Sequence, residues 1–296
     1  MPRIACIILN YNDYKTTEIL VNHIKDYNSI DNIIIVDNCS TNDSFDRLQK
    51  YNSNKIKIIK TPMNNGYGAG NNFGLLYSRD QLGCDIAIIA NPDVLFSELF
   101  VSECAEFIVN NSDVAIATGV MLNADNNIVQ ENVWKLPSAF MEVVDASSIL
   151  KRLLSSSKYE SNELLSNSNY EYVDVVSGSL FVVDSSKFIE VGLFDEDIFL
   201  YGEEDIIAIK MKKFGYYSVR LKSINYNHFH STSINTEFKK MFSRRKLMVK
   251  SKKIILRKYY SLTKWKLFLL LLLLDLSLAE AAVIEMFKKV ILKENK

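Results

Sequence analysis

Acidic side chains that follow apolar, strand-like runs are the first groups in this sequence that could do chemistry. Asp93 ends the tripeptide Asn91-Pro92-Asp93, which comes directly after the run DIAIIA, so its carboxylate should project from a strand end. Hard divalent cations such as Mg²⁺ and Mn²⁺ need oxygen ligands, often only one or two from the protein. Asp93 meets that need, although Asn-Pro-Asp is also a common turn in which the aspartate caps a helix.

A denser acidic cluster, Glu203-Glu204-Asp205, follows the apolar segment IFLYG. Carboxylates crowded at one site raise one another's pKa, which suits a general base that works near neutral pH. The alternative is a solvated helix start, where acidic side chains favour the positive end of the helix dipole.

Two of the three histidines, His228 and His230, stand in the segment NHFHSTS after a predicted strand. Alternate residues of a strand face the same way, so both rings could point into one site. A neutral imidazole would bind Mn²⁺ more readily than Mg²⁺. The third, His23, lies within a predicted helix and is expected to be structural.

Asp37 ends the strand-like run NIIIV and could accept the N3–H of a uracil or thymine ring, or it could simply cap the next helix. The segment NNGYGAGNNFG lies between a predicted strand and a predicted helix, where glycine would let the backbone approach a phosphate. Its spacing matches neither the dinucleotide fingerprint nor the phosphate-binding loop, so a plain glycine-rich turn remains the alternative. The segment contains Gly66, Gly68, Gly70 and Gly74.

The elements that would position these groups alternate along the first hundred residues. Four apolar runs (IACIILN, NIIIVDN, KIKIIK and DIAIIAN) are separated by helix-length segments at 13–27, 44–51 and 69–79. This alternation predicts parallel strands joined by crossover helices. Ligands of open parallel sheets bind at the carboxyl ends of the strands. The polar clusters at these ends are Asn10-Tyr11-Asn12, Asp37-Asn38, residues 61–65 and Asn91-Pro92-Asp93.

Later segments predict further strands at VAIATGVML, YVDVVSGSLFVVD and YYSVRL, with helices from about residue 185 and up to residue 213. Residues 147–169 are rich in serine and asparagine and predict a mobile surface loop. The cysteines form no C-x-x-C pair, and the start of the chain shows no secretory leader, so we expect a reduced, cytoplasmic protein. The 35 basic and 35 acidic residues cancel, which removes any whole-protein argument for nucleic-acid binding.

The charge is nevertheless uneven, because no acidic residue occurs between Glu237 and Asp275, while twelve Lys or Arg lie between Lys239 and Lys266. Aromatic and aliphatic residues are interleaved with this charge, which favours an interfacial segment on anionic lipid over a nucleic-acid patch. The following run LFLLLLLL is too short to cross a bilayer, so shallow insertion or packing in a homo-oligomer is expected.

Taken in order, the motifs of residues 3–235 resemble those of family-2 glycosyltransferases of GT-A fold, especially bacterial enzymes of capsule and O-antigen synthesis, including rhamnosyltransferases. The motifs that carry the resemblance are IILNYN, IIIVDNCSTND, NNGYGAGNNFG, ANPDV, GSLFVVD, GLFDEDIFLYGEED and HFHSTS. The resemblance implies an α/β fold with a Rossmann-like, mostly parallel sheet flanked by helices. Residues 1–235 would form the catalytic domain, and 236–296 a helical, basic and then apolar extension.

The resemblance also implies roles for individual residues. Asp93 and His228 would bind the metal; His228, five residues before Ser233, fits the family pattern better than His230. Glu204 would be the catalytic base, but it replaces the usual aspartate, which leaves Glu203 and Glu204 hard to rank. The candidate nucleotide-binding residues are Asn10, Tyr11, Asp37, Asn65, Gly66, Gly70 and Asn91.

The implied reaction is inverting transfer of a hexosyl group from a UDP- or dTDP-sugar to a saccharide hydroxyl, with Mn²⁺ or Mg²⁺ as cofactor. A lipid-linked acceptor in capsule, O-antigen or cell-wall synthesis would place the enzyme at the inner face of the cell membrane. The alternatives are a non-catalytic sugar-nucleotide-binding or membrane scaffold, and a Rossmann-type oxidoreductase or epimerase. A Rossmann-type enzyme would need the phosphate-binding fingerprint in the first strand–helix turn, where this sequence has NYNDYKTT instead.

Overall fold

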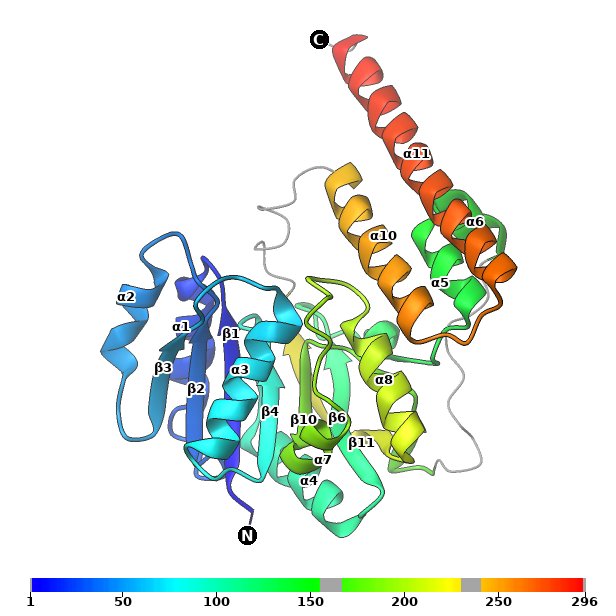
Figure 1. Ribbon diagram of the computed structural model, residues 1–296. Helices are drawn as coiled ribbons and strands as arrows, with labels where there is room; N and C mark the ends of the chain where they lie inside the picture. The colour runs from blue at the N-terminus through cyan, green and yellow to red at the C-terminus, as the bar shows by residue number, and fades with distance from the viewer. Residues whose placement is uncertain (1, 155–166, 230–240, 295–296) are drawn as a thin grey trace. The chain divides into compact units, whose positions relative to one another are not determined.

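The computed structural model describes residues 2–154, 167–229 and 241–294, and it gives the side chains of all of these except 241 and 287–294 (Figure 1). The chain forms two compact units. The first is drawn from the ranges Met1–Leu136, Lys158–Glu196 and Glu203–Ser233, and the second from Pro137–Ser157, Asp197–Gly202 and Ile234–Lys296. His230, a candidate ligand in the sequence, lies outside the described residues.

The first half of the central sheet in the first unit is parallel. Its strands follow the spatial order β3-β2-β1-β4, and Asn10 at the end of β1 is in register with Asp37 at the end of β2. The strands are β1 (Ile4–Asn10), β2 (Asn32–Asp37), β3 (Ile56–Lys60) and β4 (Ile86–Ala90), joined by α1 (Tyr14–Ile24), α2 (Ser44–Leu48) and α3 (Tyr67–Asp80). This arrangement confirms the parallel strands and crossover helices predicted from the alternating sequence.

The second half of the sheet is mixed. The strand β10 (Leu180–Asp184) runs antiparallel between β4 and β6 (Val114–Leu122), and β11 (Tyr217–His228) runs parallel to β6. Two short strands, β5 (Val94–Phe96) and β8 (Tyr170–Val173), pair antiparallel with β11. Because β10 is reversed, its first residue lies at the same edge of the sheet as the carboxyl ends of β1 and β4.

Outside this sheet, β7 (Val133–Trp134) and β9 (Val175–Val176) form a two-stranded ribbon. The helices α4 (Glu98–Asn110) and α1 cover one face of the central sheet. The other face carries α3, α7 (Ser185–Glu190) and α8 (Glu203–Phe214) (Figure 1).

Alternate strand residues build the two apolar layers of the first unit, as period-two side-chain direction requires. Cys6 and Ile8 of β1 pack in the layer with α1 and α4, whereas Ile7 packs in the layer with α3 and α8. Helix α3 lies very close to the sheet, because a Cβ on Gly74 would come within 2.6 Å of Ile7. The sheet is therefore buried on both faces, and its strand ends are free to form a site.

The second unit is helical. It contains α5 (Ala139–Ala146), α6 (Ser148–Leu154), α10 (Met241–Lys258) and α11 (Lys264–Glu294) around an apolar core that includes Val143, Val249 and Leu274. The loop predicted for 147–169 is wrong at its start, because α6 occupies Ser148–Leu154, and residues 155–166 lie outside the described residues. Its short sequence SILKRLL carries too little periodicity to signal a helix by itself.

A buried ion pair lies within the helical core. Lys252 of α10 pairs with Glu142 of α5, and both side chains are almost fully enclosed. The Tyr260 hydroxyl donates 3.1 Å to Glu142 Oε1 and 2.6 Å to the carbonyl of Pro137. A buried carboxylate needs such partners, because an unpaired one would be strongly destabilising.

Candidate active site

Asp93 and His228 meet where two strands of the sheet come together. Asp93 follows β4, and His228 is the last residue of β11. His228 is in register with Val94 of β5. His228 Nε2 lies 3.4 Å from Asp93 Oδ1, and the two side chains are only 12% and 10% exposed. Two ligands of one cation can span that separation, since each bond to Mg²⁺ is about 2.1 Å long. The residues therefore fit a divalent cation that takes two ligands from the protein.

The predicted nucleotide residues of β1 and β2 also come together. The Asn10 amide donates 2.9 Å to Asp37 Oδ2, and the backbone N–H of Ser40 donates 2.9 Å to Asp37 Oδ1. Both side chains are fully buried. The turn after β2 is conformationally costly, because Cys39 has a φ of 58° without being glycine. Tyr11 follows β1 directly and is half-buried.

The glycine-rich segment turns the chain from β3 into α3. Gly66 has a φ of 98°, which side-chain-bearing residues rarely adopt, and its carbonyl accepts from the Asn38 amide at 3.1 Å. Asn65 is exposed beside it. Gly70 lies one turn into α3, and a Cβ there would meet Leu9 at 2.4 Å. Close packing of α3 on β1 therefore accounts for Gly70, whereas Gly66 shapes the strand-end turn.

The acidic cluster opens α8 with three different environments. Asp205 is buried and accepts 2.9 Å from the indole N–H of Trp134. Glu203 is 5% exposed, and its Oε2 is buried without a hydrogen-bond partner among the described residues. Burial raises the pKa of the Glu203 carboxyl well above its usual value, and the adjacent charge of Glu204 raises it further. Burial and the neighbouring charge therefore both favour the neutral form of Glu203.

Glu204 is the most exposed member of the cluster and reaches the strand-end surface. Its Oε1 accepts 3.2 Å from the backbone N–H of Gly178, which lies just before β10. The next residue, Ser179, accepts 2.8 Å at its carbonyl from the backbone N–H of Asn91. These backbone contacts link Glu204 to the strand end that carries Asp93.

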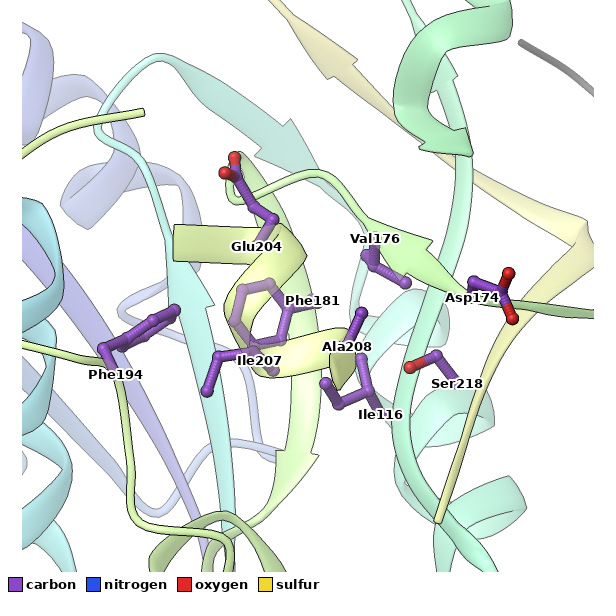
Figure 2. A pocket seen from close by; sticks show the side chains of 9 residues that line it. All are labelled: Ile116, Asp174, Val176, Phe181, Phe194, Glu204, Ile207, Ala208 and Ser218. Carbon is purple, nitrogen blue, oxygen red and sulfur yellow. The ribbon is translucent and has the colours of Figure 1, made fainter. Parts of the chain in front are cut away.

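A small hollow lies below Glu204, lined mainly by apolar side chains of α8 and the sheet. Figure 2 shows Phe181 and Ile207 in this hollow, while the carboxylate of Glu204 points away from them. Glu204 is the one candidate site residue among the side chains that line this hollow, and the candidate nucleotide and metal residues lie elsewhere.

Sequence reasoning missed Tyr67 and Gly178, both of which lie next to Glu204. A Cβ built on Gly178 would lie 3.1 Å from Glu204 Oε1 and 3.1 Å from the Tyr67 hydroxyl oxygen. Tyr67 lies in the motif NNGYGAGNNFG and Gly178 begins the motif GSLFVVD, but neither residue was given a role there. The motifs gave the positions of both residues, whereas their contact with Glu204 depends on the fold.

The described site lies at the carboxyl ends of parallel strands in an α/β sheet, with carboxylate, imidazole and carboxamide groups gathered there. A sequence model of glycosyl transferase family 2 matches residues 5–153. The chain belongs to this family, and its fold is the GT-A fold.

A curated relative is similar over most of the chain. The low-salt glycan biosynthesis hexosyltransferase Agl10 of Haloferax volcanii is 26% identical over 201 residues, which are 68% of this chain and 59% of the relative. The match thus spans less than two thirds of that relative's own length.

Solved structures share the fold at low sequence identity. The mannosyltransferase PcManGT of Pyrobaculum calidifontis, in complex with GDP-Man and Mn²⁺, is 14% identical with a TM-score of 0.57, covering 95% of this chain and 75% of that one. GalNAc-T7 with UDP, GalNAc and Mn²⁺ is 12% identical with a TM-score of 0.56, and the match covers 78% of this chain and 44% of GalNAc-T7. TarS of S. aureus is 14% identical with a TM-score of 0.53, and the match covers 92% of this chain and 70% of the TarS chain.

Proposed function

We propose that the chain is an inverting hexosyltransferase that moves a sugar from a UDP- or dTDP-sugar to a saccharide hydroxyl. The observation that carries the proposal is the pairing of Asp93 with His228 at 3.4 Å, at the strand-end surface that Glu204 also reaches. Family membership and the hexosyltransferase relative support sugar transfer. Residues 1–235 would then be the catalytic domain, and 236–296 an extension with a separate task.

Asp93 and His228 are proposed to hold one divalent cation, Mn²⁺ or Mg²⁺, with phosphate oxygens and water as its other ligands. Such a cation, when bound, neutralises charge on the diphosphate leaving group. Mn²⁺ in two of the structural neighbours supports a divalent ion. The imidazole of His228 favours Mn²⁺ over Mg²⁺.

Glu204 is proposed to take the proton of the acceptor hydroxyl as the acceptor oxygen attacks the anomeric carbon. It is favoured over Glu203 because it is half-buried and reaches the strand-end surface, whereas Glu203 is buried. A base must contact the acceptor hydroxyl, and the buried position of Glu203 leaves it less accessible for that contact. Single displacement by the acceptor needs no covalent sugar–enzyme intermediate.

Asp37 is proposed to select pyrimidine nucleotides by accepting the N3–H of the base, with Tyr11 against the ring and the Asn65–Gly66 turn and Asn91 near the phosphates. Each carboxylate oxygen of Asp37 already accepts one hydrogen bond, and each can accept a second. Because the side chain is fully buried, the base can reach it only if surrounding residues move. Cys39 has a positive φ, which marks the turn after Asp37 as strained.

We expect UDP and dTDP to raise the melting temperature in the presence of Mn²⁺ more than GDP does. In Asp37→Asn, UDP affinity should fall about 10-fold or more, since a hydrogen bond to a charged acceptor is lost. Thermal shift and calorimetry with the three nucleotides measure both effects. Asp31→Asn is the matched control, because Asp31 Oδ2 accepts from the Ile4 backbone at the opposite ends of the strands. GDP binding as tight as UDP binding in the wild type would contradict pyrimidine selection.

The extension is proposed to contact anionic lipid at the inner face of the cell membrane, where a lipid-linked acceptor would be found. Within the described residues, one segment of α11, Lys264–Met286, is long and apolar enough to cross a membrane by length and composition. The most apolar 18-residue window of this segment has a mean hydropathy of 2.4, and 17% of that window is buried. The sequence-based argument considered only the run 267–274, and the apolar helix that contains this run is longer than expected.

The polar and apolar sides of α11 differ in their contacts. Glu280 accepts 2.6 Å from the Ser147 hydroxyl, and Asp275 forms an ion pair with Lys253 of α10, so both acids have partners within the second unit. Large apolar side chains at helical spacing form an exposed stripe, which we call the α11 stripe. It contains Trp265, Phe268, Leu269, Leu272, Leu276, Val283 and Met286. Lys264 and Lys266 flank its aromatic end, which is the pattern of a helix held at a lipid headgroup layer.

We expect the triple variant Trp265→Glu, Leu272→Glu and Leu276→Glu to lose binding to vesicles that contain anionic lipid, while the wild type sediments with them. Burial of three carboxylates in lipid is strongly unfavourable, and the substituted positions are exposed, so the fold should persist. The control variant carries Leu99→Glu, Val109→Glu and Ile128→Glu, which change equally exposed apolar residues of the first unit. Equal sedimentation of both variants would argue against the α11 stripe as the lipid contact.

A further inference from the structure

Tyr67 and Gly178 connect the glycine-rich segment to the acidic cluster through two hydrogen bonds. The hydroxyl of Tyr67, the first residue of α3, donates 2.5 Å to the carbonyl oxygen of Gly178. The backbone N–H of Gly178 donates 3.2 Å to Glu204 Oε1. These two bonds therefore lead from α3, through the turn before β10, to the first turn of α8.

The two bonds hold the peptide groups on either side of the Gly178 Cα. Glycine has no side chain to restrict its backbone, so an unsupported Gly178 could rotate its N–H away from Glu204. The bond from Tyr67 removes that freedom by fixing the following peptide. A Cβ at position 178 would lie 3.1 Å from both partner atoms, so only glycine lets the two side chains approach the same turn without displacement.

The Tyr67 ring is itself held in place. It packs edge-to-face on Phe194, with ring centroids 5.7 Å apart, and a Cβ on the next residue, Gly68, would come within 2.8 Å of Phe194. Burial raises the pKa of the Tyr67 hydroxyl well above its usual value, and the charges of Glu204 and Glu203 raise it further. The hydroxyl therefore stays protonated and remains a donor at every pH at which the enzyme would work.

We propose that Tyr67 is a positioning residue for the general base, which fixes the carboxylate of Glu204 through the backbone of Gly178. This inference rests on the proposed transferase function and on Glu204 as its base. It assigns to the glycine-rich segment a second task beside the nucleotide, because the helix that begins there also orients the proton acceptor. Tyr67 touches neither donor nor acceptor in this scheme.

Tyr67→Phe removes the hydroxyl and keeps the ring on Phe194. We expect kcat for transfer to fall roughly 10- to 100-fold, since a base displaced by about 1 Å loses that much rate. The KM for the donor and the affinity for UDP should stay at wild-type values. Tyr27→Phe is the matched control, because the Tyr27 hydroxyl also donates to a backbone carbonyl, that of Phe96, at 2.8 Å. This control should retain full kcat.

A double variant separates positioning of the base from a general loss of structure. In the Glu204→Gln background, Tyr67→Phe should cause no further loss of transfer, because the group it positions is already inactive. Gly178→Ala gives an independent variant and should lower kcat with donor KM unchanged. Melting temperatures of all variants monitor folding.

The outcomes distinguish this inference from the function on which it rests. Full kcat in Tyr67→Phe, with Glu204→Gln inactive, would overturn the positioning role and leave the transferase function standing. Additive losses in the double variant would also overturn it. A wild-type protein that transfers sugar from none of the nucleotide donors would instead refute the proposed function.

Discussion

Replacing Glu204 by glutamine should lower transfer by roughly 10²- to 10⁴-fold, because glutamine keeps the size and hydrogen bonding of the side chain but cannot accept a proton. The amide oxygen can still accept from Gly178, so the turn before β10 should keep its shape. Donor affinity should therefore stay near the wild-type value. Steady-state kinetics at saturating donor, together with calorimetry of UDP binding, measures the two quantities separately.

Glu203→Gln is the matched control for this prediction, one residue away in the same helix turn. Glu203 is buried and its raised pKa favours the neutral form, so an amide of the same shape should change transfer little. The raised pKa of Glu203 also lowers stability as pH rises above the ordinary glutamate value, because the carboxyl then ionises more readily in the unfolded chain than in the folded one. Glu203→Gln should thus melt at or above the wild-type temperature near neutral pH. A large loss of transfer in Glu203→Gln alone would move the base to Glu203.

Asp93→Ala should abolish metal-dependent nucleotide binding and reduce transfer by on the order of 10³-fold or more, as the loss of several kcal/mol of charge stabilisation implies. Its strand-end position leaves the apolar layers untouched, so the fold should remain intact. UDP titrations with Mn²⁺ and with EDTA measure the effect. In EDTA, the wild type should bind UDP as weakly as the variant does.

Asp80→Ala, at the exposed end of α3, is the control for removal of an aspartate. It should keep the wild-type response to Mn²⁺. His228→Ala should weaken the Mn²⁺ response in the same direction as Asp93→Ala, because the two side chains share one contact. Undiminished transfer by Asp93→Ala in excess EDTA would remove the cation from the mechanism.

The apolar runs predicted the parallel half of the sheet correctly, because each run is followed by a polar turn and β1, β2 and β4 are buried on both faces, while β3 at the edge of the sheet is only partly buried. The expected structural role of His23 agrees with the structure, in which its ring nitrogen lies 2.9 Å from the Phe96 carbonyl oxygen. The direction of β10 could not be predicted in the same way. An apolar run such as LFVVD pairs equally well in either direction with a neighbouring strand. Its direction depends on where the strands beside it lie in the folded sheet.

The arrangement of the candidate site residues could be predicted from the sequence less completely than the strands. Strand ends predicted that Asn10 and Asp37 would adjoin, and they do. The sequence alone could not rank Glu203 against Glu204, because burial separates them and burial depends on the packing of α8. Gly70 stays a prediction as a nucleotide-binding residue; a Cβ there would meet Leu9, so the short helix–strand distance also demands glycine at this position.

The ion pair between Glu142 and Lys252 has a consequence for folding during synthesis of the chain. Its partners are 110 residues apart in the chain, so α5 leaves the ribosome long before α10 exists. At about 5–20 residues per second, Glu142 and the apolar face of α5 would wait roughly 5–20 seconds for their partners. During that interval the nascent chain exposes a surface that chaperones recognise. A slowed or truncated product that ends before α10 would keep this surface exposed, and aggregation would be its expected fate.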